Sequence, residues 1–516
     1  MNRLCKHVRG SGPWSGLGVV LFGLYALGTP ARAEVRLPKI LSDHMVLQRD
    51  TAVPIWGWSS PGEEVNVTLA GQTKTTKAGA DGKWRVQLEP LQAAGPHTLT
   101  VKGTNTLTVE DVLVGEVWLA SGQSNMEMTV RGARDFEKEQ AAADLPQIRM
   151  FTVRHNPSRE PQADCSGSWH ICSPGTVGAF SATAYFFGKD LHQKLGAPVG
   201  LINSSFGGTP IEAWTSIDVQ KNQPELAALL ATWDKRAAEY NPSTAKTAYE
   251  KQLAEWKDRA EKAKAEGKTA PRAPQRPSDP REQPHHPAVL FNGMIAPLIP
   301  YAIRGVIWYQ GESNAGSPRS GKLYGVQLPL LIKDWRTRWG RGQIPFAWVQ
   351  LPNFQTSGEG WSYVREAMLE TMSLPHTGMT VNIDIGEARD IHPKNKQDIG
   401  HRLALWALAN VYGQHLAWSG PLPSGHRTVG RAVELDFKHA DGGLVAKDGA
   451  LRGFTIAGAD KQWRPATARI EGNKVLVSNP EVKEPVAVRY DWSSNPDGNL
   501  YNGAGLPASP FRTDKD

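Results

Sequence analysis

Residues 117–128 read V-W-L-A-S-G-Q-S-N-M-E-M, and this stretch decides the predicted fold. Its first four residues are apolar or aromatic, as in a buried strand of a parallel sheet, and Gly122 then permits a sharp turn. The turn presents Ser124 between Gln123 and Asn125, whose amides can donate hydrogen bonds. A hydroxyl at the carboxyl end of a central strand is where α/β folds place a nucleophile. The alternative is a polar turn in which Ser124 only caps the next helix.

Strand and helix patterns alternate along the chain after this stretch. Short apolar runs predict further strands at residues 199–202, 306–309, 346–349 and 380–385. Apolar residues at helical spacing lie between them: Phe180, Ala184, Phe187 and Leu191 in one helix that ends near Gly196, and Leu328, Leu331, Trp335 and Trp339 in another. Residues 396–411 also predict a helix. This alternation is typical of an α/β fold with a parallel sheet flanked by helices.

Three further regions surround or interrupt the predicted α/β domain, residues 113–424. Residues 34–112 and 425–516 show period-two alternation separated by turn signals, which predicts β-rich, sandwich-like domains at both ends. Residues 218–286 form an insertion in which Pro242 separates two amphipathic patterns, so a helical hairpin is expected. The proline-rich run that follows is expected to be an extended linker.

The first 33 residues read as a signal peptide. Basic residues precede a short apolar run, and Ala31-Arg32-Ala33 fits a small-x-small cleavage site. A membrane anchor is the alternative, but the run is too short to span comfortably. We therefore expect an exported protein, in which Cys165 and Cys172 form a local disulfide.

Composition narrows the classes of partner. The formal net charge of +7 is spread along the chain, as on a solvated surface, and gives no nucleic-acid signature. No cysteine or histidine cluster has metal-ligand spacing, so no metal or other cofactor is expected. The 18 tryptophans include possible sugar-docking faces, but most are expected in the core. No membrane span is expected after signal cleavage, and the oligomeric state is left open.

Polar clusters follow the predicted strands. Ser124 follows the first strand, N-S-S-F-G-G at residues 203–208 follows the second, and Q-G-E-S-N at residues 310–314 follows the third. D-I-H-P at residues 390–393 lies just before a late helix. Each motif is weak by itself, but the carboxyl ends of parallel strands meet at one edge, which predicts a single site.

The order of these motifs resembles the SGNH (GDSL-like) hydrolases. G-Q-S-N-M, W-Y-Q-G-E-S-N and D-I-H-P more closely resemble the sialate O-acetylesterase family and related carbohydrate acetylesterases, over roughly residues 112–414. The resemblance implies an SGNH-hydrolase-like domain, preceded by a β-rich segment, that hydrolyses O-acetyl esters on sugars.

Site residues follow from the chemistry and the resemblance. Ser124 is the expected nucleophile and His392 its base. The Ser124 N–H, the N–H of Gly208 or Gly207, the Asn314 amide and Gln123 are the candidate oxyanion donors.

The carboxylate that orients His392 is harder to assign, because the usual position, three residues before the histidine, holds Arg389. Asp390 is the preferred orienting carboxylate, Glu312 is the rival acid, and Asp384 lies further back.

The favoured function is an exported serine esterase that removes acetyl groups from carbohydrate through an acyl-enzyme. One alternative is a plant polysaccharide substrate, such as xylan or pectin, in place of sialic acid. Another is a catalytically inactive carbohydrate-binding protein, which the presence of both Ser124 and His392 disfavours.

Overall fold

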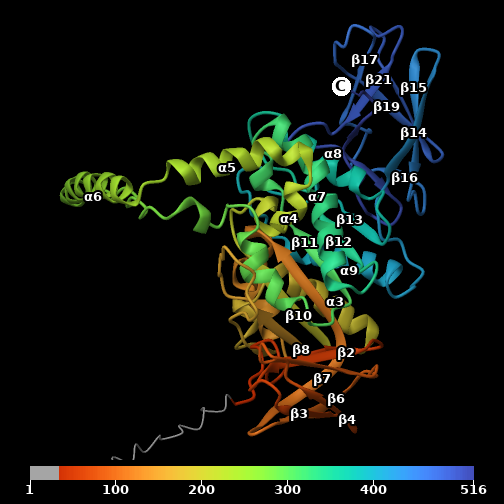
Figure 1. Ribbon diagram of the computed structural model, residues 1–516. Helices are drawn as coiled ribbons and strands as arrows, with labels where there is room; N and C mark the ends of the chain where they lie inside the picture. The colour runs from red at the N-terminus through yellow and green to blue at the C-terminus, as the bar shows by residue number, and fades with distance from the viewer. Residues whose placement is uncertain (1–33, 516) are drawn as a thin grey trace, which may run out of the picture. The chain divides into compact units, whose positions relative to one another are not determined.

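The computed structural model describes residues 34–515, and their largest element is an eleven-stranded sheet (Figure 1). The predicted signal peptide, residues 1–33, lies outside the described residues. The main path of the sheet is β13-β12-β11-β7-β10-β8-β9. Its strands are β7 (Thr106–Gly122), β8 (Leu145–Thr152), β9 (Trp169–Cys172), β10 (Val199–Ser205), β11 (Gly305–Tyr309), β12 (Phe346–Val349) and β13 (Thr377–Thr380). Neighbours on this path are parallel except β8 and β9, so β7 lies inside the parallel part, between β11 and β10.

Each face of the sheet has its own core, because successive side chains of a strand point to opposite faces. Trp308 of β11 belongs to one cluster with Trp335 of α7 (Pro318–Trp339), against which α8 (Gly360–Thr371) packs. Tyr309 belongs to the other cluster with residues of α3 (Ala182–Leu195) and α9 (Lys396–Asn410). Helices therefore cover both faces, and the predicted α/β class is confirmed.

The helices end where the sequence supplies caps. α3 ends at Gly196, whose φ of 61° is left-handed, and α7 ends in the same way at Gly340. α7 begins with a capping box at Ser317 and has Pro318 in its first turn. None of the helices among residues 34–515 combines the length and apolar character needed to cross a bilayer.

The N-terminal β-rich region is built around the first half of β7. Its strands are β1 (Val46–Gln48), β2 (Val53–Trp58), β3 (Glu64–Leu69), β4 (Gln72–Lys77), β5 (Lys83–Leu88) and β6 (Ala94–Lys102). β6 pairs antiparallel with the start of β7 and with β3, while β2 pairs with β5. Alternate residues of β3 and β5 are buried, as their period-two pattern predicts. Since β7 continues without a break across residues 112 and 113, one strand serves both regions.

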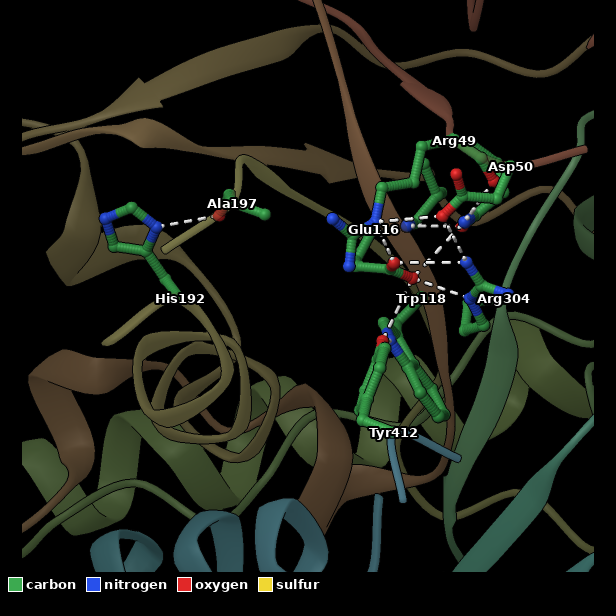
Figure 2. A network of polar contacts seen from close by, with 10 residues as sticks. Arg49, Asp50, Glu116, Trp118, His192, Ala197, Arg304 and Tyr412 are labelled. Atoms are coloured by element: carbon green, nitrogen blue, oxygen red, sulfur yellow. Dashed lines mark hydrogen bonds and ion pairs between the residues drawn. The ribbon is translucent and has the colours of Figure 1, made fainter. Parts of the chain in front are cut away.

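A buried carboxylate anchors β7 where its parallel pairing with β10 begins (Figure 2). Glu116 is fully buried and accepts hydrogen bonds from Arg49 Nε at 2.5 Å and Arg304 Nε at 2.7 Å. The Tyr412 hydroxyl adds a third, at 2.9 Å. Burial by itself would raise the pKa of Glu116, but Arg304 and then Arg49 outweigh it and hold that pKa below its ordinary value. The cluster joins segments far apart in the chain to the base of the central strand.

The C-terminal region consists of antiparallel sheets around a separate core, as predicted. Strands β14 (Leu422–Val429), β15 (Ala432–Lys438), β20 (Lys474–Ser478) and β19 (Thr467–Glu471) form one sheet in that order. Strands β18 (Arg464–Pro465), β17 (Phe454–Ala457), β21 (Ala487–Tyr490) and β23 (Phe511–Arg512) form another, and β16 (Leu444–Ala446) pairs with β22 (Leu500–Asn502). The buried Arg365 of α8 ties this region to the α/β part, because it donates to the carbonyls of Leu351, Pro352, Ser493 and Ser494.

The insertion contains the two expected helices, α5 (Ala227–Glu239) and α6 (Pro242–Ala265), with Pro242 in the first turn of α6. It does not form the predicted hairpin: α6 has no buried residue and continues outward beyond α5 (Figure 1). The indole of Trp256 donates instead to the carbonyl of Pro271 in the returning proline-rich segment, at 2.6 Å. The apolar stripe of α6 is thus covered only by local chain, which explains why it buries so little.

The strand predicted at residues 380–385 is wrong for most of its length. β13 is Thr377–Thr380, so it ends where the prediction begins. Arg402 of α9 donates to the carbonyl of Val381 at 2.7 Å and pairs with Asp384, so these polar groups face the helix and not a neighbouring strand.

The predicted disulfide is also wrong. Cys165 and Cys172 are both free, buried thiols. Cys165 packs in the core on one face of the sheet and Cys172 in the core on the other, so the sheet separates them. Burial raises the pKa of each thiol to about 12.

Candidate active site

Ser124 lies at the carboxyl end of β7, at the start of the short helix α1 (Ser124–Glu127). Gly122 makes this position possible: its φ is +141°, and a Cβ there would lie 2.0 Å from the Tyr309 carbonyl oxygen. The Gln123 N–H then donates to that same oxygen at 2.9 Å. The turn is therefore locked to β11, and it presents Ser124 at the edge where the parallel strands end.

His392 is next to Ser124, as the motifs predict. Its Nε2 lies 2.8 Å from Ser124 Oγ, although the two residues are 268 positions apart in the chain. Burial, and then the positive charge of Lys396, lowers the pKa of His392 below its ordinary value of 6.5, while Asp390 opposes this. A neutral imidazole with a free Nε2 lone pair can accept the serine proton.

Asp390 is the nearest of the three candidate acids. Its Oδ1 lies 3.7 Å from His392 Nδ1 and accepts the backbone N–H of His392 at 2.9 Å. The carboxylate is close to the ring but beyond hydrogen-bond distance, and its side chain is 45% exposed. Asp384 instead forms a bidentate ion pair with Arg402, with both contacts at 2.7 Å. Glu312 Oε1 accepts from Asn125 Nδ2 at 2.6 Å and not from the histidine.

The glycines after β10 border the serine. A Cβ on Gly207 would lie 3.4 Å from Ser124 Cβ. The Gly207 N–H donates to Glu127 Oε2 at 2.6 Å, whereas the N–H of Gly208 has no partner among residues 34–515. Gly208 also has a φ of +73°, a left-handed conformation that glycine adopts without strain.

The two side-chain amides that the sequence nominated are placed differently. Asn314 is buried, and its Nδ2 donates to Glu212 Oε2 at 3.0 Å and to Gln327 Oε1 at 3.4 Å. Its donor group is therefore used within the protein. Gln123 accepts from the Ser313 N–H at 3.3 Å, and its Nε2 has no partner in the described part of the chain.

A second histidine lies beside the site, and the sequence did not indicate it. His155 Nε2 is 2.8 Å from Glu127 Oε1, and the ring stacks on Phe206 with centroids 3.7 Å apart. The hydrogen bond with Glu127 raises the pKa of His155. The position of Glu127, one helical turn after Ser124, could have indicated from the sequence that it lies near the site. No local sequence pattern connects His155 to Glu127. Glu127 thus holds both His155 and the Gly207 N–H.

The arrangement suits acyl transfer: a hydroxyl bonded to an imidazole, with unpaired N–H groups beside it. Within residues 34–515 no group of three or more His, Cys, Asp or Glu side chains is placed to hold a metal ion.

Comparisons with known proteins agree with this chemistry. The family profile described as "Carbohydrate esterase, sialic acid-specific acetylesterase" matches residues 114–260 and 290–408, a span that includes Ser124 and His392. A sialate O-acetylesterase from Rattus norvegicus is 32% identical, over 92% of this chain and 94% of its own length. The one from Homo sapiens is 30% identical, over 96% and 95%. A crystal structure of a carbohydrate acetylesterase from Xanthomonas citri is 40% identical with a TM-score of 0.79, and covers 94% of this chain and 100% of that one.

Proposed function

This chain belongs to the sialic acid-specific acetylesterase family of carbohydrate esterases, and we propose that it hydrolyses sugar O-acetyl esters through an acetyl-enzyme on Ser124. The observation that carries the proposal is the 2.8 Å contact between His392 Nε2 and Ser124 Oγ. The protein is an ester hydrolase by its family; the serine mechanism and the substrate are our inference.

In the first half of the reaction, His392 Nε2 takes the proton of Ser124 Oγ as this oxygen bonds to the acetyl carbon. The carbonyl oxygen becomes an oxyanion, for which the N–H groups of Ser124 and Gly208 and the Nε2 of Gln123 are the available donors. We leave Asn314 out of this group because its amide donates to Glu212 and Gln327. When the intermediate collapses, the bond to the sugar oxygen breaks and that oxygen takes the proton from His392.

In the second half, water replaces the sugar. His392 Nε2 accepts a proton from water as the water oxygen bonds to the acetyl carbon, and the Ser124 Oγ–carbon bond then breaks. Ser124 recovers its proton from His392, and acetate leaves. We assign the stabilisation of the imidazolium in both halves to Asp390, whose Oδ1 is 3.7 Å from His392 Nδ1.

Ser124→Ala tests the mechanism directly. We expect it to abolish hydrolysis of 4-nitrophenyl acetate and labelling by a fluorophosphonate, with an unchanged circular dichroism spectrum, because the nucleophile is lost. Activity within a few-fold of wild type would exclude the proposed mechanism.

The substrate is proposed from the relatives. Those from rat and human are named sialate O-acetylesterases, which favours O-acetylated sialic acid. The relative from Xanthomonas citri, at higher identity, is described only as a carbohydrate acetylesterase and names no sugar, so the xylan or pectin alternative from the sequence analysis stays the second candidate. Acetate release from O-acetyl sialic acid, acetylated xylan and acetylated pectin, measured side by side with wild type and Ser124→Ala, ranks them by kcat/KM.

Export is a separate proposal, based on the basic and apolar pattern of residues 1–33 and the Ala31-Arg32-Ala33 site. N-terminal sequencing of protein recovered from the native host should give Glu34 as the first residue. A mature chain that begins at Met1 would contradict it.

A further inference from the structure

A buried polar network lies beneath the pair of Ser124 and His392. Asn125 is fully buried, and its Nδ2 donates both to Glu312 Oε1 at 2.6 Å and to the Ile391 carbonyl at 2.9 Å. Its Oδ1 accepts from Lys396 Nζ at 2.5 Å. We call Asn125, Glu312 and Lys396 the Asn125 network. Every donor and acceptor of the central amide has a partner, so its orientation is determined.

The position of this network in the chain is its most informative property. Asn125 directly follows Ser124, and the carbonyl that it holds belongs to Ile391, which directly precedes His392. Lys396 begins α9, so the network also reaches the helix that follows the histidine loop. One side chain therefore joins the backbone of the proposed nucleophile to the backbone of the proposed base.

The composition of the network is poorly suited to stability alone. Lys396 is fully buried, with its Nζ 5.0 Å from the centre of the Tyr309 ring, and it makes no ion pair with any described residue. Glu312 Oε2 and the Tyr309 hydroxyl are buried and have no hydrogen-bond partner within residues 34–515. A buried charge and unsatisfied polar atoms destabilise a fold relative to apolar residues of the same size. A function for the network accounts for their presence.

We propose that Asn125, Glu312 and Lys396 are positioning residues that hold the His392 loop against Ser124, and that Lys396 also supplies positive charge near the imidazole. The proposal rests on the serine mechanism above. A displacement of about 1 Å between reacting groups can cost about a hundredfold in rate, so a network of this kind would act on kcat and not on substrate binding.

The charges that act on Lys396 come from two segments, and an aromatic ring contacts it from β11. Glu312 follows β11, Tyr309 is in β11, and Glu387 and Asp390 lie in the loop that leads to His392. On α3, which packs against α9, Asp190 pairs with His401 and not with Lys396. Burial lowers the pKa of Lys396 to about 7, and Glu312, Asp390 and Glu387 oppose that shift. Burial likewise raises the pKa of Glu312.

Three variants test the proposal. Asn125→Asp keeps the size of the side chain but removes both donations, to Ile391 and to Glu312. Asn125→Ala removes the network's centre. Lys396→Met removes the charge, and Lys394→Met is its control, because Lys394 is exposed and has no side-chain partner among residues 34–515. Each is compared with wild type by circular dichroism and thermal denaturation, and by steady-state kinetics with 4-nitrophenyl acetate between pH 5 and 9.

We expect both Asn125 variants to lower kcat by roughly 10- to 100-fold, with KM within about twofold of wild type. Lys396→Met should also move the acid limb of kcat/KM to higher pH by about 0.5 to 1 unit, because the charge that disfavours imidazolium is gone. Lys394→Met should change neither parameter. If Lys396 only stabilised the fold, its loss would reduce the amount of folded enzyme, but it would not shift the acid limb of kcat/KM measured on the enzyme that is folded.

Two results would overturn the proposal: folded Asn125→Asp with kcat within threefold of wild type, or Lys396→Met with an unmoved acid limb. If Asn125→Ala does not fold, the near-isosteric Asn125→Asp still gives the answer. Ser124→Ala separates this failure from that of the mechanism. An inactive Ser124→Ala together with a fully active Asn125→Asp rejects the network and keeps the serine esterase, whereas an active Ser124→Ala rejects both.

Discussion

Two glutamates with enclosed carboxyl groups lie at opposite ends of the parallel strands, and their pKa values are shifted in opposite directions. Glu116, where the parallel pairing of β7 with β10 begins, contacts two arginines directly, and its pKa is held below the ordinary value despite burial (Figure 2). Glu312, just past the carboxyl end of β11, accepts from the Asn125 amide, has one oxygen without a partner in the described part of the chain, and has a raised pKa. Glu116 is fully buried and Glu312 is partly buried, but burial raises the pKa of both carboxyl groups and does not by itself account for the difference. The difference lies in whether a cation makes contact.

The comparison separates a carboxylate that holds the fold from one that supports a site. The guanidinium groups at Glu116 join residues 49, 116 and 304 into one fully paired cluster, which is what a joint between chain segments requires. Around Glu312 the polar groups are left incompletely satisfied next to Ser124 and His392. Perturbed ionisable groups of this second kind are typical of functional sites.

The largest effect is expected from Glu116→Gln, which removes the charged carboxylate at the centre of the Arg49–Glu116–Arg304 cluster. Removing one partner of a buried ion pair leaves Arg49 and Arg304 with only the more distant Asp50, at 3.4 and 3.7 Å, so we expect a loss of about 3 kcal/mol in stability. The melting temperature should fall by several degrees, while kcat at a temperature well below melting should stay near wild type. Thermal denaturation and 4-nitrophenyl acetate kinetics measure the two.

Glu312→Gln is the matched control for that prediction. The pKa of Glu116 is lowered, so its stabilising effect is present above about pH 4.5 and is lost as the pH falls through the lowered value. The pKa of Glu312 is raised, so its contribution is lost as the pH rises above 4.5. At pH 7 the melting temperature should therefore fall much less for Glu312→Gln. Equal falls in melting temperature at pH 7 would show that the two carboxylates contribute equally to stability, which would contradict the comparison.

A smaller effect, this time on rate, is expected from Asp390→Asn. We expect kcat to fall by about 10- to 100-fold, less than for an acid in full contact with the histidine, because Asp390 Oδ1 is 3.7 Å from the ring and the side chain is 45% exposed. Glu312→Gln should lower kcat less, since a glutamine oxygen still accepts from Asn125. A larger loss for Glu312→Gln at saturating substrate would transfer the orienting role from Asp390 to Glu312.

The smallest effect concerns the wild-type pH profile. Burial and Lys396 lower the pKa of His392, and the mechanism needs the neutral imidazole. The acid limb of kcat/KM should therefore have an apparent pKa below 6.5, and activity should fall only as the pH drops through that value. An acid limb above pH 6.5 would contradict the electrostatic surroundings described for His392.

Local patterns predicted most of the fold but failed where distant residues compete. Short apolar runs located β10 and β11, whose residues are all buried, and helical patterns located α3 and α9, because each pattern is set by local burial. The strand expected at residues 380–385 failed because Arg402, from a later helix, takes the Val381 carbonyl. The disulfide failed because a spacing of seven residues does not show that a sheet passes between two cysteines.

The same division holds within the site. The motifs alone nominated Ser124, His392 and Asp390, because the nucleophile turn, the base and a nearby carboxylate are each written in short local stretches. Only the tertiary structure showed that Asn314 donates to Glu212, that Glu127 holds His155, and that Lys396 reaches Asn125. The physical reason is that a hydrogen-bond partner is chosen by distance in space. A local stretch encodes which groups are offered, whereas the folding of the whole chain decides which of them meet.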